Sequence, residues 1–102
     1  MTNYILAYHG GKRPETPAEG TELMARWRAW MEGLGKSIVS PGNPVGQSTT
    51  VSALGITEDG GANPLSGYTI VQAGSLGAAQ KMAAACPHLD HGTIEVAELM
   101  EM

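Results

Sequence analysis

Two short segments of the sequence hold most of the side chains that could perform chemistry. The first is His9, which ends a run of strand-forming residues and is followed by Gly10-Gly11-Lys12-Arg13. Glycines at a strand end let the backbone approach a ligand closely, and the two cations would attract a small anion. Because an imidazole changes its charge near neutral pH, His9 could exchange a proton with such a ligand. The alternative is that His9 and both cations face solvent.

The second segment is Cys86-Pro87-His88-Leu89-Asp90-His91, which combines a thiol, two imidazoles and a carboxylate. These groups bind transition metals, but their spacing matches no common zinc pattern. Cys86 also falls on the apolar stripe of a predicted helix, where a buried thiol behaves as a small hydrophobic group. The pattern favours a helix terminus, with His88 as a candidate acid, base or hydrogen-bond donor. We expect no metal and no other cofactor.

Aromatic side chains are further candidates for ligand contact. Tyr8 and Tyr68 could hydrogen-bond a ligand, or they could lie at a sheet edge. Trp27 and Trp30 follow helical spacing, which favours packing in the core over a stacking platform. Three acidic residues near the C-terminus are interpreted as a solvated edge and tail: Glu95, Glu98 and Glu101.

Composition excludes several functional classes. The chain of 102 residues has only 16% charged residues and a net charge of −4. Nucleic acid is not an expected partner, because no basic stripe with interleaved aromatic residues is present to bind phosphates. One cysteine cannot form an internal disulfide, and no apolar run approaches the roughly 18 residues that span a bilayer. We therefore expect one cytoplasmic domain, residues 1–102, with no membrane partner.

The clearest structural signal is a helix that follows the first glycine loop. Thr16 is a good N-cap, Pro17 suits the first helical position, and Glu19 completes a T-x-x-E capping box. Apolar residues then recur every three or four positions, and Gly35 is a plausible C-cap. A helix over residues 17–34 is therefore predicted.

Strand signals surround this helix and a second one. Strands are predicted at residues 3–8, 37–40, 49–57, 67–73 and 93–97. The second helix is predicted to begin after an N-cap at Ser75 and to end before Pro87, which cannot continue it. The order β-α-β-β-β-α-β predicts an α+β, ferredoxin-like sheet with both helices on one face. The other face would expose apolar residues, so we expect a second subunit to cover it. Residues 98–102 form a tail that is either frayed or docked on a partner.

Several short motifs together resemble the YCII-related (DGPF-domain) family over nearly the whole chain. They are a first strand ending in Tyr8, Trp30-Met31-Glu32 before Gly35, Asp59-Gly60, Gly67-Tyr68-Thr69-Ile70-Val71, and Cys86-Pro87 followed by Gly92-Thr93-Ile94-Glu95-Val96. The resemblance implies a small α+β domain that pairs into a dimeric α+β barrel. Most members have no assigned activity, and some YCII-like relatives use a His and Asp pair at a cleft for lactone dehydrochlorination or a similar elimination.

Two departures from the family pattern concern the site. Where the name motif reads Asp-Gly-Pro-Phe, this chain has Asp59-Gly60-Gly61-Ala62. The resemblance implies a catalytic histidine near the start of the first helix, but residues 17–26 contain none. The family's dyad cannot be transferred, and His9 and Asp59 are the nearest substitutes by type.

These observations lead to two hypotheses of different classes. The first is a homodimer that binds a small organic molecule, anionic or lactone-like, in a cleft, and that could act on it by His-based acid/base elimination or lyase chemistry. The expected catalytic residues are His9, His88 and Asp59, and the expected ligand-binding residues are Tyr8, Lys12, Arg13 and Tyr68. The alternative is a non-catalytic dimerisation or accessory module.

Overall fold

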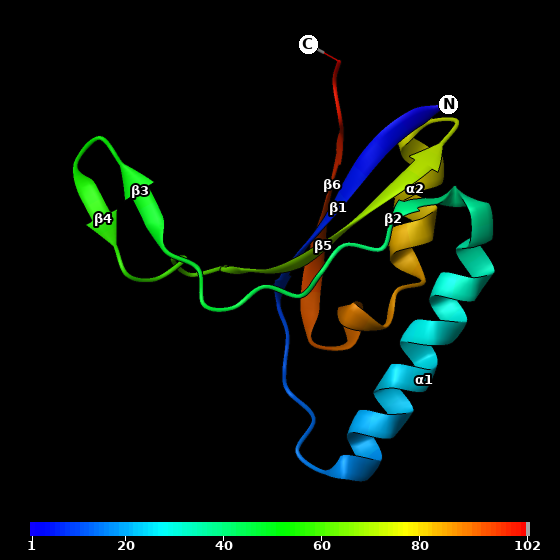
Figure 1. Cartoon of the computed structure of the whole chain (residues 1–102), viewed down its shortest axis with the longest axis horizontal. Helices are drawn as coiled ribbons and strands as arrows, with labels where there is room; N and C mark the ends of the chain where they lie inside the picture. Colours follow the sequence, from blue (N-terminus) through cyan, green and yellow to red (C-terminus); the bar gives the residue numbers. More distant parts are fainter. Residues whose placement is uncertain (102) are drawn as a thin grey trace.

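A four-stranded antiparallel sheet forms the centre of the chain in the computed structural model, which describes residues 1–101. Its strand order is β2-β5-β1-β6, so β1 pairs with both β5 and β6 (Figure 1). The strands are β1 (Thr2–Gly10), β2 (Ile38–Ser40), β5 (Leu65–Ala73) and β6 (Gly92–Glu98). Helices follow the first and third of these strands and lie on one face, which is the ferredoxin-like arrangement predicted from the sequence.

The side chains of strand β1 point alternately to the two faces of the sheet. Tyr4, Leu6 and Tyr8 are buried toward the helices, in the same core as Val71 of β5. Ile5, Ala7 and His9 lie on the opposite face and are only half-buried. Both helices lie on the face of the sheet that holds the core, so no helix covers the opposite face (Figure 1). We call this opposite face the uncovered face.

Helix α1 (Pro17–Leu34) begins at the predicted cap. Thr16 Oγ1 accepts a hydrogen bond from the Glu19 backbone N–H at 3.1 Å. The Glu19 carboxylate accepts from the backbone N–H of Glu15, one residue earlier than in a standard capping box. Trp30 is buried, and its Nε1–H donates to the Met82 carbonyl at 2.9 Å, which ties α1 to the second helix.

Helix α2 (Leu76–Ala84) begins at the predicted N-cap Ser75 and ends before Pro87, as predicted, with its last residue two positions before Cys86. Ala79 and Ala83 are buried, because their small side chains let the helix lie close to the sheet. The short 3-10 helix η2 (Pro87–Asp90) follows and carries His88. Cys86 is 3% exposed, as its place on the apolar stripe predicted.

The prediction of one strand over residues 49–57 is wrong. The chain forms a separate hairpin of β3 (Thr50–Ser52) and β4 (Gly55–Thr57), which does not join the main sheet. Gly55 has φ +129°, a backbone conformation that glycine adopts readily, and the chain reverses its direction just before this residue. Strand-forming residues on both sides of such a turn give the same sequence pattern whether they form one long strand or two short ones. We call residues 47–57 the arm.

The remaining connections are short. The 3-10 turn η1 (Gly35–Ser37) links α1 to β2, and Gly35 has φ +52°, as expected of a residue that ends a helix. After β6, the Leu99 backbone N–H donates to the Asn3 carbonyl at 2.9 Å, so the start of the tail lies against β1 of the same chain. Met102, the last residue of the predicted tail, lies outside the described residues. In the described part of the chain, no helix combines the length and hydropathy needed to cross a bilayer.

Candidate functional site

His9 lies on the uncovered face of the sheet and is held by two neighbouring acceptors. Its Nε2 is 2.9 Å from Oε1 of Glu95, and its Nδ1 is 2.9 Å from the backbone oxygen of Asn63. The strand register pairs Ala7 with Glu95, which brings the carboxylate to the same face as His9. The His9 side chain is therefore only 17% exposed.

The two acceptors determine what the His9 ring can do. A carboxylate and a backbone carbonyl only accept hydrogen bonds, whereas a neutral imidazole has a single N–H to donate. Only the doubly protonated ring satisfies both partners at once. Both ring nitrogens of His9 are thus engaged by neighbours, so the ring anchors the end of β1 and offers no free nitrogen to a ligand.

His88 has the opposite arrangement. Its Nε2 lies 2.9 Å from the backbone oxygen of His9, which can only accept, so Nε2 carries the proton. In the neutral ring Nδ1 then bears the lone pair, and within residues 1–101 the structure records no hydrogen-bond partner for it. The ring packs on Tyr8 with centroids 5.2 Å apart. The neutral His88 ring therefore has one nitrogen, Nδ1, without a recorded partner in the described residues.

Glycines make room for the His88 ring. A Cβ on Gly92 would clash with Nε2 of His88 and with the His9 carbonyl oxygen. A Cβ on Gly11 would approach the same ring at 3.1 Å, and Gly11 also has φ +107°. The glycine loop identified from the sequence therefore borders one imidazole directly. The chain can pass this close to the ring only because these positions lack side chains.

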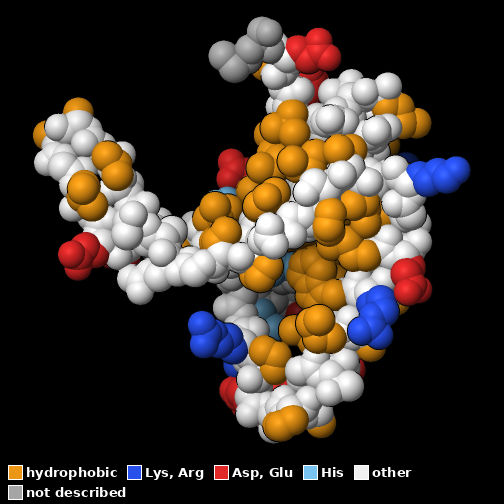
Figure 2. All heavy atoms as spheres, in the orientation of Figure 1, with side chains coloured by type: hydrophobic (Ala, Val, Ile, Leu, Met, Phe, Trp, Pro, Cys, Tyr) orange, Lys and Arg blue, Asp and Glu red, His pale blue; other side chains and the backbone are white. Residues whose placement is uncertain are grey.

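Charged side chains surround this end of the molecule. Figure 2 shows histidine side chains recessed between the loop after β1 and α1, with cationic side chains on either side. Lys12 of this loop forms an ion pair with Glu15 at 3.0 Å, and Arg13 is exposed. The Arg26 guanidinium bonds the Asp90 carboxylate, which holds the pKa of Asp90 below and that of Arg26 above the ordinary values.

Tyr8 and Cys86 are buried beside His88 and remain neutral. Thr69 donates its hydroxyl proton to the Pro41 carbonyl at 3.0 Å, so the Tyr8 hydroxyl donates to Thr69 Oγ1 at 2.6 Å. Burial raises the pKa of Tyr8 above its ordinary value and raises that of the Cys86 thiol to about 11. The Tyr8 hydroxyl, a predicted ligand contact, is thus used inside the core.

Asp59 and Tyr68 lie apart from the His88 ring. The Asp59 carboxylate accepts from the Gly61 backbone N–H at 3.0 Å in the loop that follows the arm. Among residues 1–101 the structure records no hydrogen bond or ion pair of Asp59 with His9 or His88. Tyr68 is half-buried and pairs with Ala7, so it lies on the uncovered face. The predicted catalytic residues are thus divided between two faces and a loop, with His9 and His88 joined through one backbone carbonyl.

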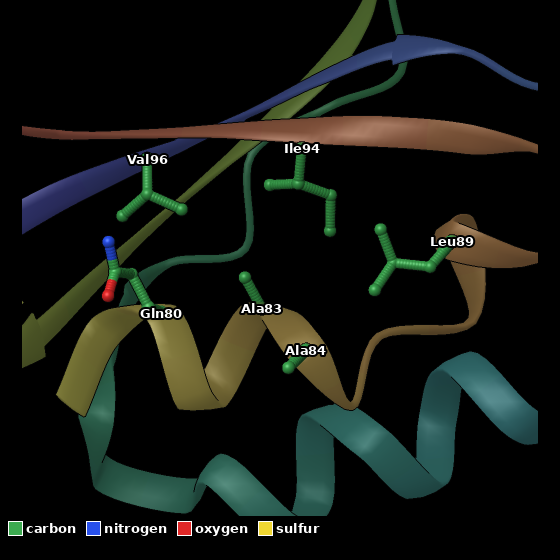
Figure 3. Close-up of a pocket in the computed structure, with 6 residues that line it drawn as sticks. All are labelled: Gln80, Ala83, Ala84, Leu89, Ile94 and Val96. Carbon is green, nitrogen blue, oxygen red and sulfur yellow. The ribbon is translucent and has the colours of Figure 1, made fainter. Parts of the chain in front are cut away.

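A separate apolar pocket lies between α2 and β6. Figure 3 shows its lining side chains pointing toward one another across the gap between helix and strand. Its volume is about 300 Å³, and it is lined by Gln80, Ala83, Ala84, Leu89, Ile94 and Val96. None of the predicted site residues belongs to it. Within residues 1–101 no cluster of three metal-binding side chains is found.

The contact of Glu95 with His9 was not predicted from the sequence, because Glu95 was interpreted as part of a solvated edge. Its role depends on the register of β6 against β1, and a shift of one residue would turn it to the other face. The alternation of Thr93, Glu95 and Ala97 opposite Ile94 and Val96 was the available signal. This alternation identifies which face of β6 is polar, but it does not identify the residue that Glu95 contacts.

Comparison with known proteins supports the resemblance seen in the sequence. No curated protein matches the chain. The family model of the YCII-related domain matches residues 1–102, and it therefore covers the whole sequence. This chain belongs to the YCII-related domain family.

Proposed function

We propose that the chain acts as a cytoplasmic homodimer that binds a small organic anion or lactone in the hollow beside His88. The observation that carries the proposal is the hydrogen bond from His88 Nε2 to the His9 carbonyl, which leaves the Nδ1 lone pair available. Lys12 and Arg13 supply positive charge on the adjoining loop. A base next to a cationic rim suits a substrate that carries a carboxylate or an ester carbonyl.

The chemistry that this arrangement supports is an elimination. His88 Nδ1 takes a proton from a carbon beside the carbonyl group of the ligand. The electron pair of that C–H bond becomes a carbon–carbon double bond, and the group on the next carbon leaves with its own electron pair. His88 then returns the proton to solvent. His9 acts here as a positioning residue, because its carbonyl fixes the His88 tautomer while Glu95 and Asn63 hold its ring.

The homodimer is supported by the uncovered sheet face. Ile5 pairs with Ile70, and Ala7 pairs with Tyr68, so a strip of apolar side chains crosses the middle of this face. These residues are half-buried within one chain and have no helix above them. A second copy packed on the same face would bury the strip and form the dimeric α+β barrel.

A titration followed by NMR tests the site. The wild-type protein is mixed with a panel of small carboxylates and γ-lactones that carry a leaving group, and amide shifts and deuterium uptake at the ligand carbon are measured. We expect shifts in residues 10–13 and 88. We expect His88→Gln to lose about 100-fold in deuterium uptake, while His91→Gln, an exposed neighbour, matches wild type.

The results also separate the two classes of function. Shifts confined to the pocket between α2 and β6, or unchanged deuterium uptake in His88→Gln, would contradict the proposal. The second candidate, an accessory module without catalysis, is favoured by the two imidazole rings lying on opposite faces of the sheet. It predicts a dimer in which no compound of the panel shifts residues 10–13.

A further inference from the structure

The arm carries apolar side chains that the rest of the chain leaves in water. Val51, Leu54 and Ile56 are 75%, 100% and 73% exposed. Residues 47–57 contain no charged side chain at all. Figure 2 shows these hydrophobic atoms on the arm, away from the main body. Soluble proteins seldom leave three neighbouring large apolar side chains in water without a partner for them.

The arm is also too small to be stable by itself. Its strands β3 and β4 have three residues each and contact mainly each other. The side-chain hydrogen bonds at its base join neighbouring parts of the same segment: Gln47 donates to the Glu58 carbonyl, and Thr50 donates to the Asp59 carbonyl. An isolated two-stranded hairpin is marginal in water, so a regular arm needs a surface to pack against.

The accessible area and the radius of gyration of the chain exceed those of a compact monomer of the same size. Its accessible area is 7097 Å², whereas a monomeric protein of 10.6 kDa exposes about 5,500 Å². The radius of gyration is 14.8 Å, compared with about 13 Å for a compact domain of this length. The excess of about 1,600 Å² per subunit is what an obligate homodimer buries, since such interfaces cover about 2,000–5,000 Å² in total.

We infer that the arm of each subunit packs on a second copy of this chain. In Figure 1 the arm extends on the side of the sheet away from α1 and α2, which is the side of the uncovered face. A copy that covers this face therefore also meets the arm. Two-fold symmetry lets both subunits bury their arms in the same way. The inference rests on the homodimer of the proposed function, but it does not depend on the His88 site.

The absence of charge on the arm makes other occupants less suitable. A nucleic acid or an acidic peptide would require cations, and residues 47–57 have none. The apolar strip around Ile5 and Ile70 on the uncovered face is a surface of matching character. Because every folded subunit brings its own copy of this strip, the arm would be covered whenever the dimer forms.

Analytical ultracentrifugation of the full-length chain tests the inference. The arm variant combines Val51→Thr, Leu54→Ser and Ile56→Thr, which keeps strand-forming residues and removes apolar surface. The control is Met24→Ser, which changes an exposed apolar residue on α1, 62% exposed. We expect wild type and control to be dimers, and we expect the dissociation constant of the arm variant to rise at least about 100-fold. Circular dichroism checks that the variant remains folded.

The possible results distinguish the arm from the homodimer. A monomeric wild type would overturn both proposals. A dimeric arm variant with an unchanged dissociation constant would overturn the arm inference and leave the homodimer standing. Isotope-filtered NMR on mixed labelled and unlabelled wild type gives an independent readout that does not depend on a variant. Contacts from the Leu54 and Ile56 methyl groups to the other subunit are expected, and their absence in a dimer would contradict the inference.

Discussion

At the scale of single residues, the site depends on one backbone carbonyl. The His9 oxygen accepts from His88 Nε2, and the His9 ring is held by Glu95 and Asn63. One histidine thus fixes the other while its own side chain is fully occupied. The types of these residues suggested acid/base chemistry from the sequence, but which ring carries a free lone pair follows only from the contacts.

Gly92 tests how tightly the two histidines are packed. In Gly92→Ala the new Cβ would clash with the His88 ring and with the His9 carbonyl, so the ring or the strand end must shift. We expect a loss of about 1–3 kcal/mol in the free energy of unfolding, measured by urea denaturation. Gly33→Ala is the control, because its Cβ meets no atom within 4 Å and lies in a helix. It should be stabilising by roughly 0.5–1 kcal/mol. Equal effects of the two substitutions would contradict the packing described here.

The ion pair of Arg26 and Asp90 predicts a pH dependence. Hydrogen bonding to Arg26 lowers the pKa of Asp90 from its ordinary value of 3.8. A carboxyl group with a lowered pKa stabilises the folded state above its ordinary pKa, and this stabilisation is lost as the pH falls through the lowered value. The melting temperatures of wild type and Asp90→Asn should therefore differ at neutral pH and converge below pH 3.8. Because both side chains are exposed, the difference should be small. A gap that persists in acid would contradict this account.

At the scale of elements, local signals predicted the helices well. The cap at Thr16 and the stop at Gly35 are local features, so the bounds of α1 follow from the sequence. The arm shows where this approach fails, because residues 49–57 favour strands without specifying a partner or a turn. The register that brings Glu95 to His9 could not be predicted either, because pairing between distant strands is not a local property of the sequence.

Helix α1 offers a test of the capping contribution. Thr16→Ala removes the oxygen that accepts from the Glu19 N–H, so we expect a loss of about 1 kcal/mol in the free energy of unfolding. The matched control is Thr21→Ala, whose hydroxyl donates to the Pro17 carbonyl inside the same helix. That contact competes with helical geometry, and alanine has the higher helix propensity, so the control should be neutral or stabilising. A control that costs as much as Thr16→Ala would show that the cap is not the cause.

At the scale of the whole molecule, low charge and small size have a structural explanation. Only 16% of the residues are charged, and the exposed apolar side chains include Val51, Leu54 and Ile56 of the arm. The ferredoxin-like order of elements was predictable from the sequence because two amphipathic helices need one shared sheet face. The projection of the arm was not, since the strand-forming residues 49–57 do not specify which strand they pair with.

The central claim is that Nδ1 of His88 has no hydrogen-bond partner among residues 1–101 while the His9 carbonyl fixes the tautomer of the ring. A long-range ¹H–¹⁵N correlation spectrum of the wild-type protein measures this directly, at a pH where the His88 ring is neutral. The account predicts a protonated Nε2 and an unprotonated Nδ1 for His88. A neutral His88 ring with its proton on Nδ1 would contradict the account, because the His9 carbonyl would then lack its donor and Nδ1 would have no lone pair to act as a base.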